Sequence, residues 1–295
     1  MNVVSTHDAG FFSCCSVKLD DIVDFINTKH IVPSVDGSSQ FSMYKFNHGD
    51  ITYDYFEKYN NIQNIIKYPI DYKENYQFMD YSLLEYNTIL PIVKKYYTPS
   101  KHVMNTVEYL KNKYEINEHN EDFEPFESGQ YEYIAVYYRA TDKIEETQIA
   151  SFEEFYNKII EINKDNLKII IQTDSSQFLD YIKSKLNNLI IILENDTTSS
   201  DKGVHFLNGP KKNYQDMFYL FSTFLILSKC KYIITGSSNA SMWMMFYRGN
   251  NHNVHQYLNG QWLNNKPNTN HGLYIAKTDH KTEHKRDFSK FFFNQ

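Results

Sequence analysis

Arginine is rare in this chain, and one arginine follows directly on a strand-like run. Only three of the 30 basic residues are arginine, at positions 139, 248 and 286. Where lysine is the usual cation, an arginine indicates a place that needs the planar, bidentate guanidinium. Arg139 comes straight after the apolar run 131–138. A guanidinium in that place can hold two oxygens of an anionic group such as a phosphate.

Polar residues also follow three further apolar runs in the second half of the chain. Runs 131–138, 167–172, 189–193 and 232–234 are short and rich in Ile or Val, which predicts strands buried on both faces of a parallel sheet. The polar residues that come next are Arg139 to Lys143, Asp174, Glu194 to Asp196, and Gly236 to Ser238. Ligands of open α/β sheets bind beyond the carboxyl ends of the strands. We therefore expect one site built from these strand ends.

Helical patterns lie between these runs. Ser151 and Glu154 form a capping-box pattern, which predicts a helix from there to about Ile162. Residues 175–186 are amphipathic, and residues 214–229 form a long, largely apolar helical pattern. The alternation of strands and helices predicts a Rossmann-like, doubly wound domain.

The first half of the chain begins in the same way but is less regular. The patterns predict strands at 2–5 and 31–35, a tight turn from His7 to Gly10, and helices at 17–28, 81–97 and 100–114. The acidic stretch 115–130 has the composition of a linker. We therefore expect an α/β protein with two Rossmann-like lobes, residues 1–128 and 129–295, and a cleft between them.

The composition excludes several classes of protein. The chain has 295 residues, a net charge of -6 and 41% hydrophobic residues, so it has enough apolar material for a packed core. An acidic balance argues against a general nucleic-acid binder. No run approaches the roughly 18 apolar residues of a membrane span, and the first residues do not resemble a signal peptide. Three cysteines without a spacing pattern predict reduced thiols. We expect a cytoplasmic protein.

The standard cofactor and metal motifs are missing. The chain has neither a G-x-x-x-x-G-K-[ST] loop nor a G-x-G-x-x-G segment, and no two aspartates are spaced as D-x-D. His280, Glu283 and His284 match an H-x-x-E-H zinc pattern. The stretch around them is charged on all sides, so a solvated segment is the favoured interpretation, and we expect no metal.

Three blocks of the second half resemble one enzyme family. The segment YYRATDKIEETQIASFEEFYNKI, which begins at Tyr137, resembles the arginine motif of the α-1,6-fucosyltransferases, including the bacterial Nod-factor fucosyltransferases. Arg139, Thr141, Asp142 and Lys143 match that motif in register. The blocks TDSSQFLDYIKSKL and LSKCKYIITGSSNASMWMMFYRGN are similar to two later blocks of the family. The resemblance covers most of residues 131–250 and is looser in the first lobe.

The resemblance implies a metal-independent, inverting glycosyltransferase of the GT-B type, with a nucleotide-sugar donor in the cleft between the lobes. It implies that Arg139 stabilises the departing diphosphate and that a carboxylate beyond Lys143 is the general base. Glu146 is favoured over Glu145 for that role, and Lys143 would orient it. The implied donor-binding residues are Arg139, Asp142, Asp174, Gly236, Ser237, Ser238 and, in the first lobe, Gly10. Asp142 as a turn cap, and Ser237 and Ser238 as helix caps, are the structural alternatives.

The chain departs from the family pattern at two positions that lie close to the donor in the family. The family's second arginine is Ala140 here, and its leading histidine is Tyr137. GDP-fucose is the leading donor, another nucleotide-linked deoxy or amino sugar is next, and the acceptor is expected to be a glycan hydroxyl. A degenerate member that binds a glycan or nucleotide without turnover is the alternative that Ala140 motivates. A methyltransferase would need a glycine-rich loop after its first strand, which is missing.

Overall fold

The computed structural model describes residues 2–45, 49–59, 69–116, 126, 131–141, 143, 146–186, 189–193 and 207–264. Several residues of the sequence analysis lie outside these ranges: Asp142, Glu145, Glu194, Asp196, His280, Glu283, His284, Arg286 and most of the predicted linker. The predictions made for them stay predictions.

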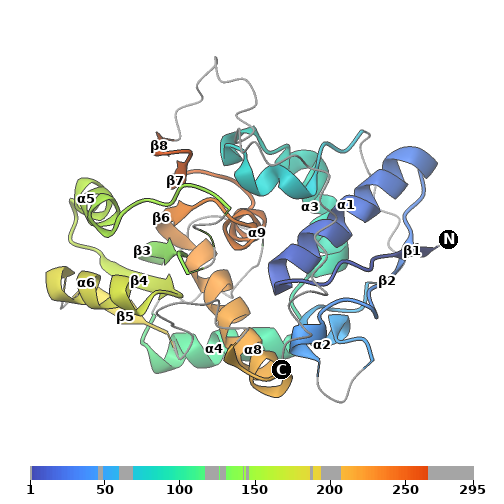
Figure 1. Ribbon diagram of the computed structural model, residues 1–295, viewed down its shortest axis with the longest axis horizontal. Helices are drawn as coiled ribbons and strands as arrows, with labels where there is room; N and C mark the ends of the chain where they lie inside the picture. Colours follow the sequence, from blue (N-terminus) through green and yellow to red (C-terminus); the bar gives the residue numbers. More distant parts are fainter. Residues whose placement is uncertain are drawn as a thin grey trace, which may run out of the picture.

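A six-stranded sheet forms the centre of the second half (Figure 1). Its strands are β3 (Tyr131–Tyr138), β4 (Lys168–Thr173), β5 (Ile190–Ile192), β6 (Cys230–Gly236), β7 (Val254–Leu258) and β8 (Gln261–Asn264), in the order β5-β4-β3-β6-β7-β8. Every neighbouring pair is parallel except β7 and β8. The four predicted strands are confirmed, since each apolar run lies within one strand or overlaps it.

Strands β7 and β8 were not predicted, because the residues around His252 and His255 look like an Asn-rich loop. The hairpin turn between the two strands consists of Asn259 and Gly260, whose φ angles are 50° and 81°. Two consecutive positive φ angles are typical of the type I′ turn, for which Asn-Gly is the preferred pair. That dipeptide was the available signal for the hairpin.

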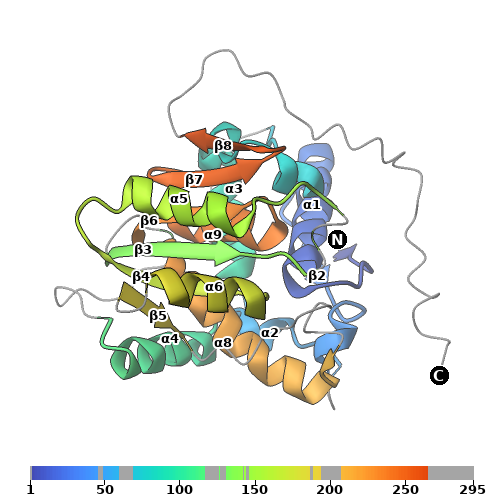
Figure 2. The same ribbon diagram turned by 60° about the vertical axis from the view of Figure 1, so that its left-hand side comes forward.

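Helices cover both faces of the sheet, and the side chains of each strand alternate between them. Helices α5 (Phe152–Ile162) and α6 (Ser176–Leu186) lie in front of the strands in Figure 2. They share a core cluster with Ile134, Val136 and Tyr138 of β3. The alternate residues Ala135 and Tyr137 belong to the cluster of α8 (Pro210–Ser228) and α9 (Asn239–Arg248). The predicted capping box of α5 is confirmed.

The first half opens with a parallel β-α-β unit, as predicted. It consists of β1 (Asn2–Val4), α1 (Phe11–Lys29) and β2 (Ser34–Asp36), and α1 begins six residues earlier than the pattern indicated. Short helical segments follow: η1 (Ser42–Tyr44), α2 (Thr52–Tyr55), η2 (Glu74–Phe78) and η3 (Tyr81–Leu83). Two longer helices, α3 (Tyr86–Tyr97) and α4 (Lys101–Lys113), complete it.

The predicted helix 81–97 is divided in the structure. Leu84 has the extended backbone angles φ −68° and ψ 128°, so η3 ends there and α3 starts at Tyr86. Asp80 caps η3 by accepting a hydrogen bond from the Ser82 N–H at 2.9 Å. The division leaves Tyr81 outside the long helix, and its hydroxyl reaches the second half of the chain.

One apolar core joins the two halves. Phe12 of α1 lies edge-on to Phe224 of α8, with ring centroids 5.1 Å apart. The indole N–H of Trp243, on α9, donates to the Ser16 hydroxyl at 2.9 Å in the same core. Helix α4 packs along α8. The described residues of the first half contain one two-stranded sheet, and the boundary near residue 128 stays a prediction.

None of the helices within the described ranges is long and apolar enough to cross a membrane. The cysteines Cys14, Cys15 and Cys230 are buried free thiols, which confirms the prediction of reduced cysteines.

Candidate active site

The candidate site lies where the strand order reverses. From β3 the chain proceeds to β4 and β5 on one side of the sheet, and it returns to β6 and β7 on the other. Loops that diverge at such a point open a crevice at the carboxyl ends of the strands. In Figure 2 the arrowhead of β3 points toward α1 and β2, so this edge of the sheet faces the first half.

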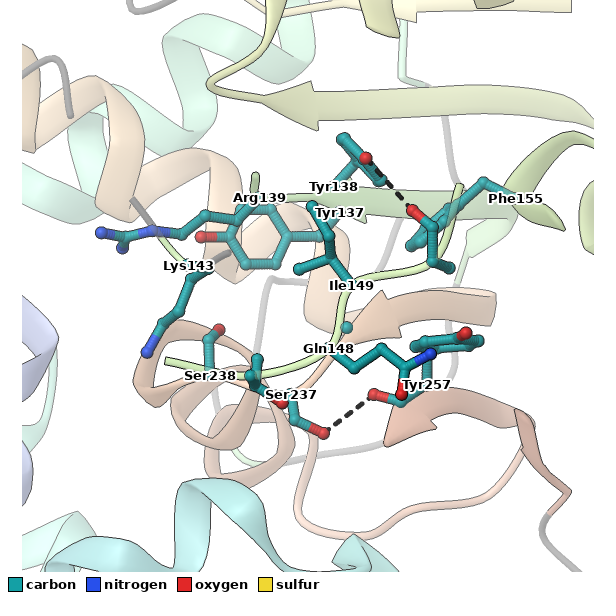
Figure 3. Close-up of a pocket in the computed structure, with 13 residues that line it drawn as sticks. Tyr137, Tyr138, Arg139, Lys143, Gln148, Ile149, Phe155, Ser237, Ser238 and Tyr257 are labelled. Atoms are coloured by element: carbon teal, nitrogen blue, oxygen red, sulfur yellow. Dashed lines mark hydrogen bonds between the residues drawn. The ribbon is translucent and has the colours of Figure 1, made fainter. Parts of the chain in front are cut away.

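A pocket opens at this edge, between the ends of β3 and β6 (Figure 3). Its free volume, open solvent included, is about 340 Å³. It is lined by Tyr137, Tyr138, Arg139, Lys143, Thr147, Gln148, Ile149, Ala150, Phe155, Gly236, Ser237, Ser238 and Tyr257. The structure therefore brings together five of the predicted site residues around one pocket: Arg139, Lys143, Gly236, Ser237 and Ser238.

Arg139 is the first residue after β3, and 29% of its side chain is exposed. Its side chain and that of Lys143 extend to the same side of the pocket in Figure 3. Arg139 also acts electrostatically on Tyr44: burial raises the pKa of Tyr44, and the positive charge of Arg139 opposes that rise. The Tyr44 hydroxyl accepts a hydrogen bond at 3.1 Å from the Phe11 N–H, which begins α1. Arg139 thus lies near the first half of the chain.

Asp174 holds the turn that carries Arg139. Its carboxylate accepts hydrogen bonds from the Ala140 N–H at 2.9 Å and from the Thr141 hydroxyl at 2.7 Å. The Nε atom of Arg139 lies 3.9 Å from the same carboxylate. These contacts give Asp174 a positioning role in the structure, and its predicted contact with a donor stays a prediction.

Lys143, which lines the same pocket as Arg139, forms an ion pair with Glu146. The Lys143 Nζ atom lies 2.5 Å from Glu146 Oε2, and the two side chains are 6% and 26% exposed. A tight turn produces this contact, because the N–H groups of Glu146 and Thr147 both donate to the Lys143 carbonyl, at 2.9 and 3.0 Å. The Lys143 ammonium also lies over the ring of Phe78, 5.3 Å from its centroid. Lys143 lines the pocket and Glu146 does not, so the partly exposed Glu146 carboxylate is joined to the pocket through the buried Lys143 ammonium.

The start of α9 closes the pocket on the β6 side. Ser238 is the N-cap of α9 and accepts a hydrogen bond from the Ser241 N–H at 3.1 Å. The Ser237 hydroxyl donates to the Tyr257 carbonyl at 2.9 Å and accepts from the Gln256 amide at 2.8 Å. Ser238 is therefore a helix cap in the structure. A direct donor contact of either serine stays a prediction.

Two of the N–H groups at this helix start donate to side chains of the first half. The Ser238 N–H donates to the Tyr81 hydroxyl, and the Asn239 N–H donates to the Gln77 side-chain carbonyl, both at 3.1 Å. A diphosphate at these two groups would have to replace the protein acceptors. Gly236 offers open space instead, since a Cβ added there would meet no atom within 4 Å.

Gly10 is the N-cap of α1 and does not line the pocket. Its backbone angles, φ −57° and ψ 149°, are accessible to any residue, and a Cβ added there would meet no atom within 4 Å. Nothing in the packing of the protein therefore requires glycine at this position.

Arg248 uses its guanidinium in the way expected of a rare arginine, but away from the pocket. It is 2% exposed and donates to the carbonyls of Ser228, Cys230 and Lys231 and to that of His252, at 2.7–3.3 Å. The rarity of arginine therefore indicated a position that needs the planar guanidinium. At Arg248 the guanidinium binds backbone carbonyls of the protein itself.

Sequence reasoning missed Gln77, Tyr81 and Gln256. The Gln256 amide donates to the Met79 carbonyl and to Ser237, both at 2.8 Å, and its carbonyl accepts from the Tyr81 N–H at 3.0 Å. Single glutamine and tyrosine side chains without a motif carry no sequence signal for such contacts.

No protein-family model and no curated protein matches the sequence. Solved structures do match. A NodZ α-1,6-fucosyltransferase soaked with GDP-fucose is similar with a TM-score of 0.50 and 12% identity, over 83% of this chain and 92% of that chain. The fucosyltransferase NodZ from Bradyrhizobium is similar with a TM-score of 0.48 and 9% identity, over 83% and 93% of the two chains.

A third structure, NodZ co-crystallised with GDP, has a TM-score of 0.47 and 11% identity, over 89% of this chain and 97% of that chain. The NodZ structure with a TM-score of 0.50 supports the fold of this chain. This chain has a NodZ-like fucosyltransferase fold.

Proposed function

We propose that the protein is a glycosyltransferase that moves a sugar from a nucleotide-sugar donor to a hydroxyl of a glycan. The observation that carries this proposal is that Lys143, which forms an ion pair with Glu146, lines the same pocket as Arg139 at the switch point of the sheet. The NodZ structure of the same fold was soaked with GDP-fucose. A cation for the diphosphate and a carboxylate for the acceptor are the two groups that such a transfer needs.

Arg139 would hold the diphosphate of the donor. Its guanidinium is partly exposed at the pocket and is oriented by Asp174. Gly236, on the opposite wall, leaves room for a ligand to approach the backbone closely. With Lys143 nearby, two fixed positive charges would stabilise the leaving diphosphate without a metal ion.

Glu146 would be the general base. In a direct displacement the acceptor oxygen bonds to the anomeric carbon of the sugar while the bond from that carbon to the diphosphate oxygen breaks. Glu146 takes the proton of the acceptor hydroxyl, and the negative charge leaves with the diphosphate. One displacement inverts the anomeric centre. Lys143 would orient the carboxylate through their 2.5 Å contact.

The same proposal includes a GT-B arrangement, with residues 1–128 as the acceptor-side lobe and 129–295 as the donor lobe. The parallel unit of β1, α1 and β2 supports it, and so does the position of the first half opposite the carboxyl end of β3. Fucose is the leading sugar. Tyr137, which stands where the family has histidine, is 5% exposed and packs edge-on against Phe224 at 4.8 Å. Because of this difference a UDP- or dTDP-linked sugar is the second candidate donor.

Donor turnover with Glu146→Gln tests the proposal. We expect the wild-type protein to release nucleotide from GDP-fucose, or from a UDP- or dTDP-sugar, and the variant to lose about 100-fold in rate with little change in nucleotide affinity. Glu132→Gln is a matched control, because Glu132 is an exposed residue of β3 at the other end of that strand. Nucleotide binding without turnover by the wild type would contradict catalysis and favour the degenerate binder that Ala140 suggests.

A further inference from the structure

A short segment of the first half lies across the start of α9. It runs from Gln77, in η2, to Tyr81, in η3. The Tyr81 hydroxyl donates to the Ser238 carbonyl and accepts from the Ser238 N–H, both at 3.1 Å. Gln256 binds both the carbonyl of Met79 and the N–H of Tyr81. The segment is therefore fixed to the wall of the pocket at several points.

Gln77 connects this segment with the ion pair of the site. Its side-chain carbonyl accepts two hydrogen bonds from the second half, one from Lys143 Nζ and one from the Asn239 N–H, both at 3.1 Å. A carbonyl oxygen has two lone pairs, so one Gln77 oxygen satisfies both donors. The Lys143 ammonium thus lies between two acceptors, Gln77 and Glu146, and above the ring of Phe78.

This arrangement determines where the ammonium points. A lysine side chain loses much rotamer freedom when it is held in one position, so one exposed partner holds it poorly. Lys143 is 5% exposed and has acceptors on two sides. Because Asn239 begins α9, the same Gln77 oxygen also sets the distance between the ammonium and the helix start.

We propose that Gln77 is a positioning residue of the transfer reaction, acting through Lys143 on the carboxylate of Glu146. The inference rests on the proposed function, since it assigns Gln77 a role in that same site. It also means that a residue of the first half completes the catalytic pair of the second half. Gln77 does not take or give a proton, and it affects the rate because it holds the base in place.

Two substitutions separate this role from general packing. Gln77→Met keeps the length of the side chain and removes the acceptor, whereas Gln77→Glu keeps an acceptor oxygen. Asn75→Leu is the matched control, because Asn75 is an exposed residue of the same short helix. The assay is nucleotide release from GDP-fucose, or from the UDP- or dTDP-sugar that the wild type turns over. Unliganded melting temperatures are measured in parallel.

We expect Gln77→Met to lower kcat by about tenfold while the donor KM stays within about twofold, since misplacing a catalytic group lowers the rate of the chemical step. Gln77→Glu should recover most of kcat, and Asn75→Leu should match the wild type. The inference is overturned if Gln77→Met retains the wild-type kcat, if only the donor KM rises, or if the loss of kcat accompanies a large fall in melting temperature.

A wild-type protein that neither binds a nucleotide nor turns over a nucleotide sugar would overturn the proposed function, and the role of Gln77 with it. Full activity of Gln77→Met beside an active wild type would overturn the role of Gln77 alone. The two failures are therefore distinguishable.

Discussion

Replacing Asp174 should lower the free energy of unfolding of the protein, because the Asp174 carboxylate holds the turn after β3 in place. Asp174→Ala removes the acceptor of two short hydrogen bonds, from the Ala140 N–H and the Thr141 hydroxyl. A hydrogen bond to a charged group contributes about 1.5–3 kcal/mol. The Asp174 side chain is 18% exposed, so water can replace part of the hydrogen bonding that is lost. The ion pair with Arg139 is long, at 3.9 Å, and therefore contributes little to the free energy of unfolding. We expect a decrease of about 2–3 kcal/mol in the free energy of unfolding.

Chemical denaturation measures this change directly. Asp174→Asn should lose less, about 1 kcal/mol, because the amide oxygen can still accept from the Ala140 N–H. Asp180→Ala, an exposed aspartate on α6, is the control and should change the free energy of unfolding by less than about 0.5 kcal/mol. A loss below about 0.5 kcal/mol for Asp174→Ala, combined with weaker nucleotide binding, would refute the positioning role. Asp174 would then act on the donor itself, as predicted from the sequence.

Two further predictions address the pocket and the core. Gly236→Ala should leave the melting temperature nearly unchanged, because a Cβ there meets no atom within 4 Å, and should weaken nucleotide binding by about tenfold if the ligand approaches this backbone. Unchanged affinity in calorimetry would count against that approach. Lys18 is 2% exposed among aromatic rings, and burial lowers its pKa. Lys18 therefore binds its proton more tightly in the unfolded state than in the folded state. As a result the free energy of unfolding rises with pH between the lowered pKa of the folded state and the unfolded pKa near 10.4. Lys18→Met should stabilise the protein by about 1 kcal/mol at pH 7 and by less at pH 10, as urea denaturation at the two pH values would show. An equal effect at both pH values would disprove the linkage.

Local patterns in the sequence predicted much of the second half. The apolar runs of β3, β4 and β6 are buried because helices cover both faces of the sheet. A strand buried on both faces has a continuous apolar sequence, so these strands could be predicted from their residues alone. The capping box of α5 depends on Ser151 and Glu154 alone, so it needs no tertiary information. The position of Arg139 at the end of β3 follows from the same strand pattern.

The remaining features depend on contacts between distant segments. The predicted helix 81–97 is divided at Leu84, and Tyr81, on the short side of the break, bonds to Ser238, 157 residues away in the chain. Gln77 and Asn239 are 162 residues apart, and nothing in the composition around either residue indicates their contact. The Asp174 carboxylate was expected to contact the donor, and the structure shows it bound to the turn of Ala140 and Thr141. A polar residue at a strand end can serve the ligand or the loop, and only the three-dimensional arrangement distinguishes these roles.

Nucleotide binding to Arg139 is the most direct test of the proposed function. Thermal shifts with GDP, UDP, dTDP and CDP should show stabilisation of the wild type by one nucleotide, and a ligand at 100 times its Kd contributes about 2.7 kcal/mol. Arg139→Ala should abolish the shift, and Arg139→Lys, which keeps the charge without the bidentate fork, should retain part of it. GDP as the stabilising nucleotide would support fucose, and UDP or dTDP would support the second candidate donor. No shift with any of the four, or an equal shift in Arg139→Ala, would contradict a nucleotide-sugar site at the switch point between β3 and β6.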